Sequence, residues 1–182
     1  MQVIETSISG ALLLKPKVFK DERGFFLESY NKKKLFEISG INHEFVQDNH
    51  SRSSKGVLRG MHYQLENSQG KLVRVNNGRV QDVIIDIRLS SPTFGHYYSV
   101  ELSDHNQLQL WIPSGMAHGF LVLSDEADLL YKTTDYYYPE SEQTILWNDI
   151  DLNIEWKIGE QIPKVSLKDQ KGVAFKDAIY YD

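Results

Sequence analysis

Short runs in which apolar and polar residues alternate fill the chain between residues 71 and 134. A period of two is typical of β-strands that bury one face. Turn-forming sequences separate the runs, namely SSPTFG, SDHN, PSG and SDEA. Asn77-Gly78 lies between the first two runs and predicts a tight hairpin there. We expect strands over 71–75, 79–88, 97–102, 108–112, 118–123 and 128–134.

The segment 31–39, NKKKLFEIS, is the one good helix candidate, because Asn31 can cap its start and Gly40 can end it. Strands at short, even spacing favour an all-β antiparallel fold, such as a jelly roll or barrel. A parallel α/β fold would need helices between successive strands, and the pattern lacks them. Since no linker or repeat is visible, we expect one domain over residues 1–182.

Composition narrows the class of protein. Apolar residues make up 41% of the chain, enough for a core, and the formal charge of −5 argues against nucleic acid as the main partner. The chain has no cysteine, which excludes disulfides and thiolate chemistry. The N-terminal MQVIETSISG lacks the pattern of a signal peptide, and no apolar run is long enough to span a membrane. We therefore expect a cytoplasmic protein that does not act at a membrane.

The stretch GVLRGMHYQ (56–64) places Arg59, His62 and Gln64 inside a run that otherwise resembles a buried strand. Burying such groups without partners costs several kcal/mol, so solvent or a ligand must reach them. Strict alternation would put Arg59 and His62 on opposite faces. We expect Gly60 to mark a β-bulge that resets the alternation.

The stretch WIPSGMAHGF has the spacing Pro113-x-Gly115-x-x-His118, which resembles the second motif of the cupin superfamily. The first cupin motif supplies two histidines as H-x-H, but the matching GMHYQLE holds only His62, with Gln64 in the second place. A first-row metal site typically needs three or more imidazole or carboxylate ligands. We therefore expect neither a metal nor another cofactor.

Longer strings resemble one family. They are PKVFKDERGFFLESYN, FVQDNHSRSSKGVLRGMHYQ, QGKLVRV, SPTFG, QLWIPSGMAHGFLVLS, YKTTDYYYPESEQTILWND and VSLKD. All are similar to the dTDP-4-dehydrorhamnose 3,5-epimerases, metal-free cupin-fold enzymes of activated-sugar biosynthesis. The resemblance implies a cupin-type double-stranded β-helix with a few short helices. It also implies inversion of C3 and C5 of dTDP-4-dehydro-6-deoxy-D-glucose, giving dTDP-4-dehydro-L-rhamnose. Only 170–182 matches no motif.

The resemblance further implies residue roles. His62 is the expected general base, Asp169 its carboxylate partner and Tyr131 the general acid. Lys71 is expected at the keto oxygen of the sugar. The expected nucleotide-sugar site comprises Arg23, Phe26, Glu28, Gln47, Asp48, Asn49, Arg59, His118, Tyr137, Glu142 and Lys168.

The chemistry of C–H inversion needs these residue types. The C4 ketone acidifies C3–H and C5–H, because the carbanion is delocalised as an enolate. His62 suits a neutral base, since the unperturbed pKa of histidine is about 6.5, and Asp169 can fix its tautomer. Lys71 supplies positive charge to the enolate oxygen, work that a metal does elsewhere. Tyr131 would deliver a proton to the opposite face, and alternation puts it on the strand face opposite Lys132.

The nucleotide diphosphate would be the handle of the substrate. Arg23 and Arg59 suit its oxygens through paired donors. Tyr137 matches the tyrosine that stacks on thymine, although the three tyrosines at 136–138 leave this open by one position. Stacking on a base is worth ~1–3 kcal/mol. Family members are homodimers that exchange N-terminal strands, so we expect a dTDP-sugar and a second copy as partners.

Four other readings stay open at this level. A relative could invert C3 or C5 only, and a 3,4-ketoisomerase would also work through an enolate. A metal-dependent cupin oxygenase would need ligands that the chain lacks. A sugar-binding module without turnover would not need the combination of His62, Asp169, Tyr131 and Lys71.

Overall fold

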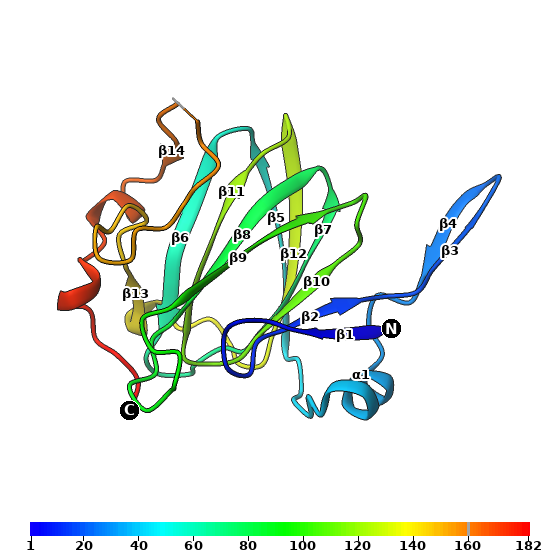
Figure 1. Cartoon of the computed structure of the whole chain (residues 1–182), viewed down its shortest axis with the longest axis horizontal. Coiled ribbons are helices and arrows are strands. Elements are labelled where there is room, and N and C mark those ends of the chain that lie inside the picture. Colours follow the sequence, from blue (N-terminus) through cyan, green and yellow to red (C-terminus); the bar gives the residue numbers. More distant parts are fainter. Residues whose placement is uncertain (160) are drawn as a thin grey trace.

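The computed structural model describes residues 1–159 and 161–182 as two facing sheets, a short helix and a projecting hairpin (Figure 1). The first sheet contains, in spatial order, β1 (Gln2–Glu5), β2 (Leu12–Lys15), β10 (Gln109–Ile112), β7 (Lys71–Asn77), β12 (Glu126–Thr133) and β5 (Gln47–Ser54). The second contains β13 (Glu142–Thr144), β6 (Val57–Gln64), β11 (Met116–Val122), β8 (Arg79–Asp86) and β9 (Tyr97–Ser103), with β14 (Lys164–Val165) alongside β6.

Apolar residues from both sheets meet in the space between them. Val73 and Leu129 of the first sheet and Ile84 and Leu102 of the second belong to one buried cluster. The strands within each sheet pair antiparallel, apart from the parallel β14–β6 contact. The predicted all-β jelly roll and its six central strands are therefore confirmed.

The helix also follows the prediction. Helix α1 spans Lys32–Ser39, the Asn31 side chain accepts a hydrogen bond from the Lys34 N–H, and Gly40 ends the helix in the left-handed conformation. Short 3-10 turns follow later in the chain, namely η1 (Pro139–Ser141), η2 (Asp169–Lys171) and η3 (Phe175–Asp177).

The hairpin predicted at Asn77-Gly78 is wrong. The chain does turn there, with Gly78 at φ +74°, but β7 and β8 do not pair. Strand β7 lies between β10 and β12, whereas β8 lies between β11 and β9. The turn carries the chain from one sheet to the other, a choice set by long-range pairing.

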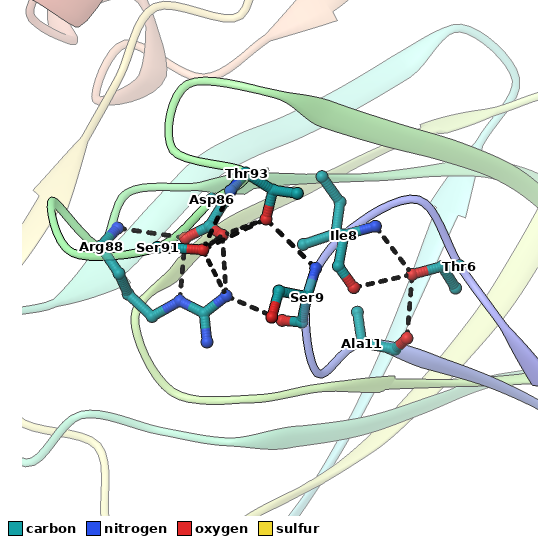
Figure 2. A network of polar contacts seen from close by, with 8 residues as sticks. All are labelled: Thr6, Ile8, Ser9, Ala11, Asp86, Arg88, Ser91 and Thr93. Atoms are coloured by element: carbon teal, nitrogen blue, oxygen red, sulfur yellow. Dashed lines mark hydrogen bonds and ion pairs between the residues drawn. The ribbon is translucent and has the colours of Figure 1, made fainter.

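A polar network around the buried Asp86 carboxylate anchors the loop between β1 and β2 to the second sheet (Figure 2). The Asp86 carboxylate accepts hydrogen bonds from Arg88 Nε at 2.9 Å, Ser91 Oγ at 2.5 Å and Thr93 Oγ1 at 2.6 Å. Burial alone would raise the pKa of Asp86, but these hydrogen bonds lower it to about 2. Arg88 also donates to the Ser9 carbonyl, and the Ser9 N–H donates to Thr93. The loop between β1 and β2 is thereby fixed.

After β2, the chain forms a hairpin that projects from the body of the molecule. Strands β3 (Val18–Asp21) and β4 (Gly24–Leu27) pair only with each other and project away from both sheets (Figure 1). Phe19, Phe25 and Phe26 on this hairpin are all more than half exposed. Such an apolar, unsupported hairpin indicates a surface that packs against something else.

The expected bulge lies at Gly60. Opposite β11, His62 pairs with His118 and Arg59 pairs with Phe120, so β6 has one more residue than its partner over this stretch. Gly60 has φ +120°, and a Cβ there would lie 2.5 Å from the Cα of Gly119. The extra residue allows Arg59 and His62 to line the same cavity.

Gly60→Ala should therefore destabilise the fold strongly. We expect a loss on the order of 3 kcal/mol in the free energy of unfolding, because the methyl group has no space and the backbone is strained. Gly56→Ala is the matched control. Gly56 also has positive φ but faces open space, so its loss should be about 1 kcal/mol. Equal losses in urea unfolding would show that close packing at Gly60 is unimportant.

Candidate active site

A cavity of about 170 Å³ opens between the two sheets. It is smaller than the roughly 300–1,000 Å³ of typical ligand pockets, so it suits one small part of a ligand with the rest of the ligand outside. Seven of the residues predicted for the site line it: Arg59, His62, Lys71, His118, Tyr131, Tyr137 and Glu142.

His62 and Asp169 form a close pair. His62 Nε2 on β6 lies 2.5 Å from Oδ1 of Asp169, which is buried in η2. Burial alone would raise the pKa of Asp169, but the hydrogen bond and charge of His62 outweigh burial and hold this pKa below its usual range. The Gly60 N–H also points at the carboxylate, at 3.4 Å. A carboxylate on Nε2 leaves Nδ1 of the ring as the free nitrogen, the arrangement that a base needs.

Lys71 and Tyr131 come from the opposite sheet. Lys71 begins β7 and is 9% exposed, and burial lowers its pKa to about 8, although the charges of Glu142 and Asp82 oppose this. Tyr131 lies on β12, where burial and then the charge of Glu142 raise its pKa. A phenol with a raised pKa stays protonated and can act as an acid. Lys132, its neighbour, points to the outer side and pairs with Asp48, so the predicted facing is confirmed.

A second imidazole–carboxylate pair lies beside the first. His118 on β11 is the cross-strand partner of His62, and its Nε2 lies 3.0 Å from both oxygens of Asp82. Asp82 is fully buried and His118 is 7% exposed. The sequence reading assigned His118 to the site but missed Asp82, whose only signal is a carboxylate inside the apolar run VQDVIIDI.

Three predicted residues form a cluster at the rim. The Tyr137 hydroxyl donates to Glu142 Oε2 at 2.7 Å, and Lys168 also pairs with that carboxylate. The hydrogen bond to Glu142, together with burial, raises the pKa of Tyr137 to about 12. Of the three consecutive tyrosines, Tyr137 is the one that lines the cavity.

Gln64, which occupies the place of the second cupin histidine, positions these tyrosines. Its side-chain amide donates to the Tyr136 carbonyl at 3.2 Å and accepts from the Tyr138 N–H at 3.1 Å. A buried glutamine there is satisfied by the tyrosine loop, which explains why the strand carries it.

The inward face of β5 supplies more polar groups. Gln47 donates to Asn49 Oδ1 at 3.0 Å and accepts from the Tyr137 N–H. Ser53 accepts from Arg59 Nε at 3.1 Å. Ser51 lies between them and lines the cavity with a buried hydroxyl that lacks a hydrogen-bond partner in the part of the chain described. Its two-residue spacing from Asn49 was a usable signal that the sequence reading missed.

The structure does not bring every predicted residue to this cavity. Arg23 and Phe26 are exposed on the projecting hairpin, and Glu28 pairs with Lys34 beyond it. Asp48 faces outward towards Lys132. These four residues lie away from the cavity within this chain.

Neither His62 nor His118 sits in a ligand cluster. Among residues 1–159 and 161–182, no three His, Asp or Glu side chains gather closely enough to hold a metal ion. Over the same residues, no helix is long and apolar enough to cross a bilayer.

The fold and the site together define a cupin-type jelly roll with an acid–base cavity between its sheets. A model of the family described as dTDP-4-dehydrorhamnose 3,5-epimerase matches residues 5–177. The chain is 57% identical over 182 residues to the dTDP-4-dehydrorhamnose 3,5-epimerase of Shigella flexneri, covering 100% of this chain and 99% of that protein. The chain belongs to the dTDP-4-dehydrorhamnose 3,5-epimerase family.

Solved structures agree on the fold. The dTDP-6-deoxy-D-glucose-3,5-epimerase RmlC of Legionella pneumophila, in complex with dTDP-4-keto-L-rhamnose, matches with a TM-score of 0.94 and 52% identity over 98% of this chain and 94% of that one. ChmJ, a 3'-monoepimerase of Streptomyces bikiniensis in complex with dTDP-quinovose, matches with a TM-score of 0.87 and 29% identity over 96% and 87%. The fold is thus shared by enzymes that differ in the number of carbons inverted.

The buried Lys71 ammonium should cost stability. Lys71→Met removes the charge, and we expect the free energy of unfolding at pH 7 to rise on the order of 3 kcal/mol, since each pKa unit between 10.5 and about 8 is worth ~1.4 kcal/mol. As the pH rises from 8 towards 10.5, folded wild type loses this proton while the unfolded chain keeps it. Wild type therefore gains stability, and its difference from the variant shrinks.

Urea unfolding at pH 7 and pH 9.5 measures both effects. Lys132→Met is the matched control, because this lysine lies on the outer face, and its change should stay within about 0.5 kcal/mol. A Lys71→Met protein no more stable than wild type at pH 7 would contradict the burial argument.

Proposed function

We propose that this chain inverts C3 and C5 of dTDP-4-dehydro-6-deoxy-D-glucose to give dTDP-4-dehydro-L-rhamnose. The observation that carries the proposal is the His62–Asp169 pair, which opens into a cavity that also holds Lys71 and Tyr131. Relatives that carry the name of this activity are similar to the chain over its whole length.

In the proposed mechanism, each inversion is a proton exchange through an enolate. The imidazole of His62 takes the proton from the carbon next to the C4 ketone, and the electron pair of the C–H bond moves to the C4 oxygen. The Lys71 ammonium stabilises that oxyanion in a site shielded from water. Tyr131 then gives its proton to the other face of the same carbon as the C4 carbonyl re-forms.

The two sheets support this division of work. His62 lies on β6 of one sheet and Tyr131 on β12 of the other, with the cavity between them. A sugar ring held there would present one face to the base and the other to the acid. Asp169 stabilises the imidazolium that forms after proton abstraction.

The remaining predicted residues would bind the nucleotide. Arg59 lines the cavity and offers paired donors to a diphosphate, while Tyr137 at the rim offers a ring face to thymine. These contacts would hold the sugar in register for proton transfer. The cavity is too small for the whole nucleotide sugar, which agrees with a thymine ring that lies outside it at the rim.

Proton exchange in heavy water tests this function. Wild type should place deuterium at both C3 and C5 of the keto-sugar, as followed by NMR. His62→Ala should slow exchange ~10²–10⁴-fold with little change in dTDP affinity. The exposed His105→Ala is the control and should exchange like wild type. Label at one carbon only would support a monoepimerase instead, and unchanged exchange in His62→Ala would exclude His62 as the base.

We further propose that the chain is a single domain that acts as a homodimer with exchanged N-terminal hairpins. The β3–β4 hairpin exposes Phe19, Phe25 and Phe26, and it projects from its own body. Strand β5 is the edge of the first sheet and carries Gln47 and Asn49 beside the cavity. A partner hairpin added along this edge would bring its Arg23, Phe26 and Glu28 to the site.

Mixing two inactive variants tests the exchange. In an Arg23→Ala/His62→Ala heterodimer, the chain that keeps His62 would receive intact Arg23 from its partner, so one site in two should work. Co-expressed and co-purified heterodimers should therefore recover about half of the wild-type rate per dimer. His62→Ala/Tyr131→Phe heterodimers are the control and should stay inactive, since both residues act in their own chain. No recovery in the first pair would contradict the exchange.

A further inference from the structure

Asp82 is a buried carboxylate without an assigned role. It lies in β8 with no exposed surface, and its two oxygens are equally distant, 3.0 Å, from Nε2 of His118. Within the described residues, His118 is its sole hydrogen-bond partner. A carboxylate in such a place is costly unless positive charge compensates it.

The Lys71 ammonium lies on the opposite sheet and faces the same cavity as this pair. His118 and Lys71 both line the cavity, and the charge of Asp82 acts to raise the pKa of Lys71 against the effect of burial. Glu142 acts in the same direction but already pairs with Lys168 and Tyr137 at the rim. Asp82 is therefore a buried carboxylate of the second sheet whose charge acts on Lys71 from behind His118.

The two imidazole–carboxylate pairs form a pattern. His62 and His118 are cross-strand partners, and each has its Nε2 on a buried carboxylate. Asp169 supports the ring that would remove the proton. Asp82 supports a ring that lines the same cavity as the Lys71 amine, which would meet the enolate oxygen.

We propose that Asp82 is a positioning residue of the active site, which orients His118 and keeps the Lys71 ammonium charged inside the cavity. The inference rests on the proposed function only for the task of the Lys71 charge, which is to stabilise the enolate oxygen. The geometry of the two pairs stands without it. Asp82 acts through His118 and Lys71 and does not need to touch the substrate.

The test is the alkaline limb of the rate–pH profile. The titratable and charged groups that line the cavity with Lys71 are His62, His118 and Arg59 from the opposite sheet, Tyr131 from the neighbouring strand, and Tyr137 and Glu142 at the rim, while Asp82 lies behind His118. Removing the Asp82 charge makes the ammonium easier to deprotonate. In Asp82→Asn, kcat should therefore begin to fall at a pH at least 0.5 unit (roughly a threefold change in proton concentration) below wild type.

Two variants separate this role from a structural one. Asp86→Asn removes another fully buried carboxylate of the same strand. Asp86 belongs to the network that holds the loop between β1 and β2. This substitution should lower the melting temperature without moving the limb. His118→Gln keeps the Asp82 charge, so it should lower the rate while the limb stays at or above its wild-type pH.

A direct measurement keeps the proposal testable if activity is lost. The ¹⁵Nζ resonance of Lys71 can be titrated by NMR in wild type and in Asp82→Asn, without substrate. A downward shift of its midpoint in Asp82→Asn supports the proposal, and an unchanged midpoint overturns it. Should Asp82→Asn not fold, titration of Lys71 in His118→Gln decides. A Lys71 midpoint that stays at or above its wild-type pH supports the role of the Asp82 charge. A midpoint that falls would show that the His118 imidazole holds the Lys71 pKa up, and it would overturn the proposal. Absence of deuterium exchange in wild type would instead count against the proposed function alone.

Discussion

The contact between His62 and Asp169 is the constraint on which the site depends. It joins strand β6 to a 3-10 turn more than a hundred residues later in the chain, so the imidazole–carboxylate pair forms only when the C-terminal segment packs against the second sheet. The bulge at Gly60 belongs to the same constraint. It rotates β6 so that His62 meets both Asp169 and the cavity, and its N–H points at the same carboxylate. The geometry of the His62–Asp169 pair therefore depends directly on how the fold packs.

A cavity between two sheets suits chemistry that acts on both faces of a ring. Each sheet contributes groups by period-two alternation, so a single strand supplies an inward residue at every second position. His62 and His118 come from one sheet, and Lys71 and Tyr131 from the other. The low dielectric of this space strengthens each interaction between charges, but it also raises the desolvation cost of burying each charge. The protein offsets that cost with carboxylates placed behind the rings, at Asp169 and Asp82.

The N-terminal part of the chain follows a different principle. The network around Asp86, Arg88 and Thr93 fixes the loop between β1 and β2 (Figure 2), whereas the β3–β4 hairpin beyond β2 projects from the body (Figure 1) and exposes aromatic residues. The β1–β2 loop and the β3–β4 hairpin therefore depend on different residues.

The sequence by itself determined the elements and the chemical inventory. Alternation located the central strands, Asn31 and Gly40 bounded the helix, and the resemblance of the motif strings to one family pointed to His62, Lys71, Tyr131 and Asp169. Local signals suffice for the strands and the helix, because strand alternation and helix caps are properties of neighbouring residues.

Tertiary structure decided the rest. Asn77-Gly78 has the local preference of a hairpin, yet β7 and β8 enter different sheets, because pairing with β10, β12, β11 and β9 outweighs the turn. The partnership of Asp82 with His118 and the outward direction of Asp48 likewise depend on which strands lie side by side. Such pairings join residues far apart in the chain, and the free energy that selects them comes from packing the whole barrel rather than from any short segment.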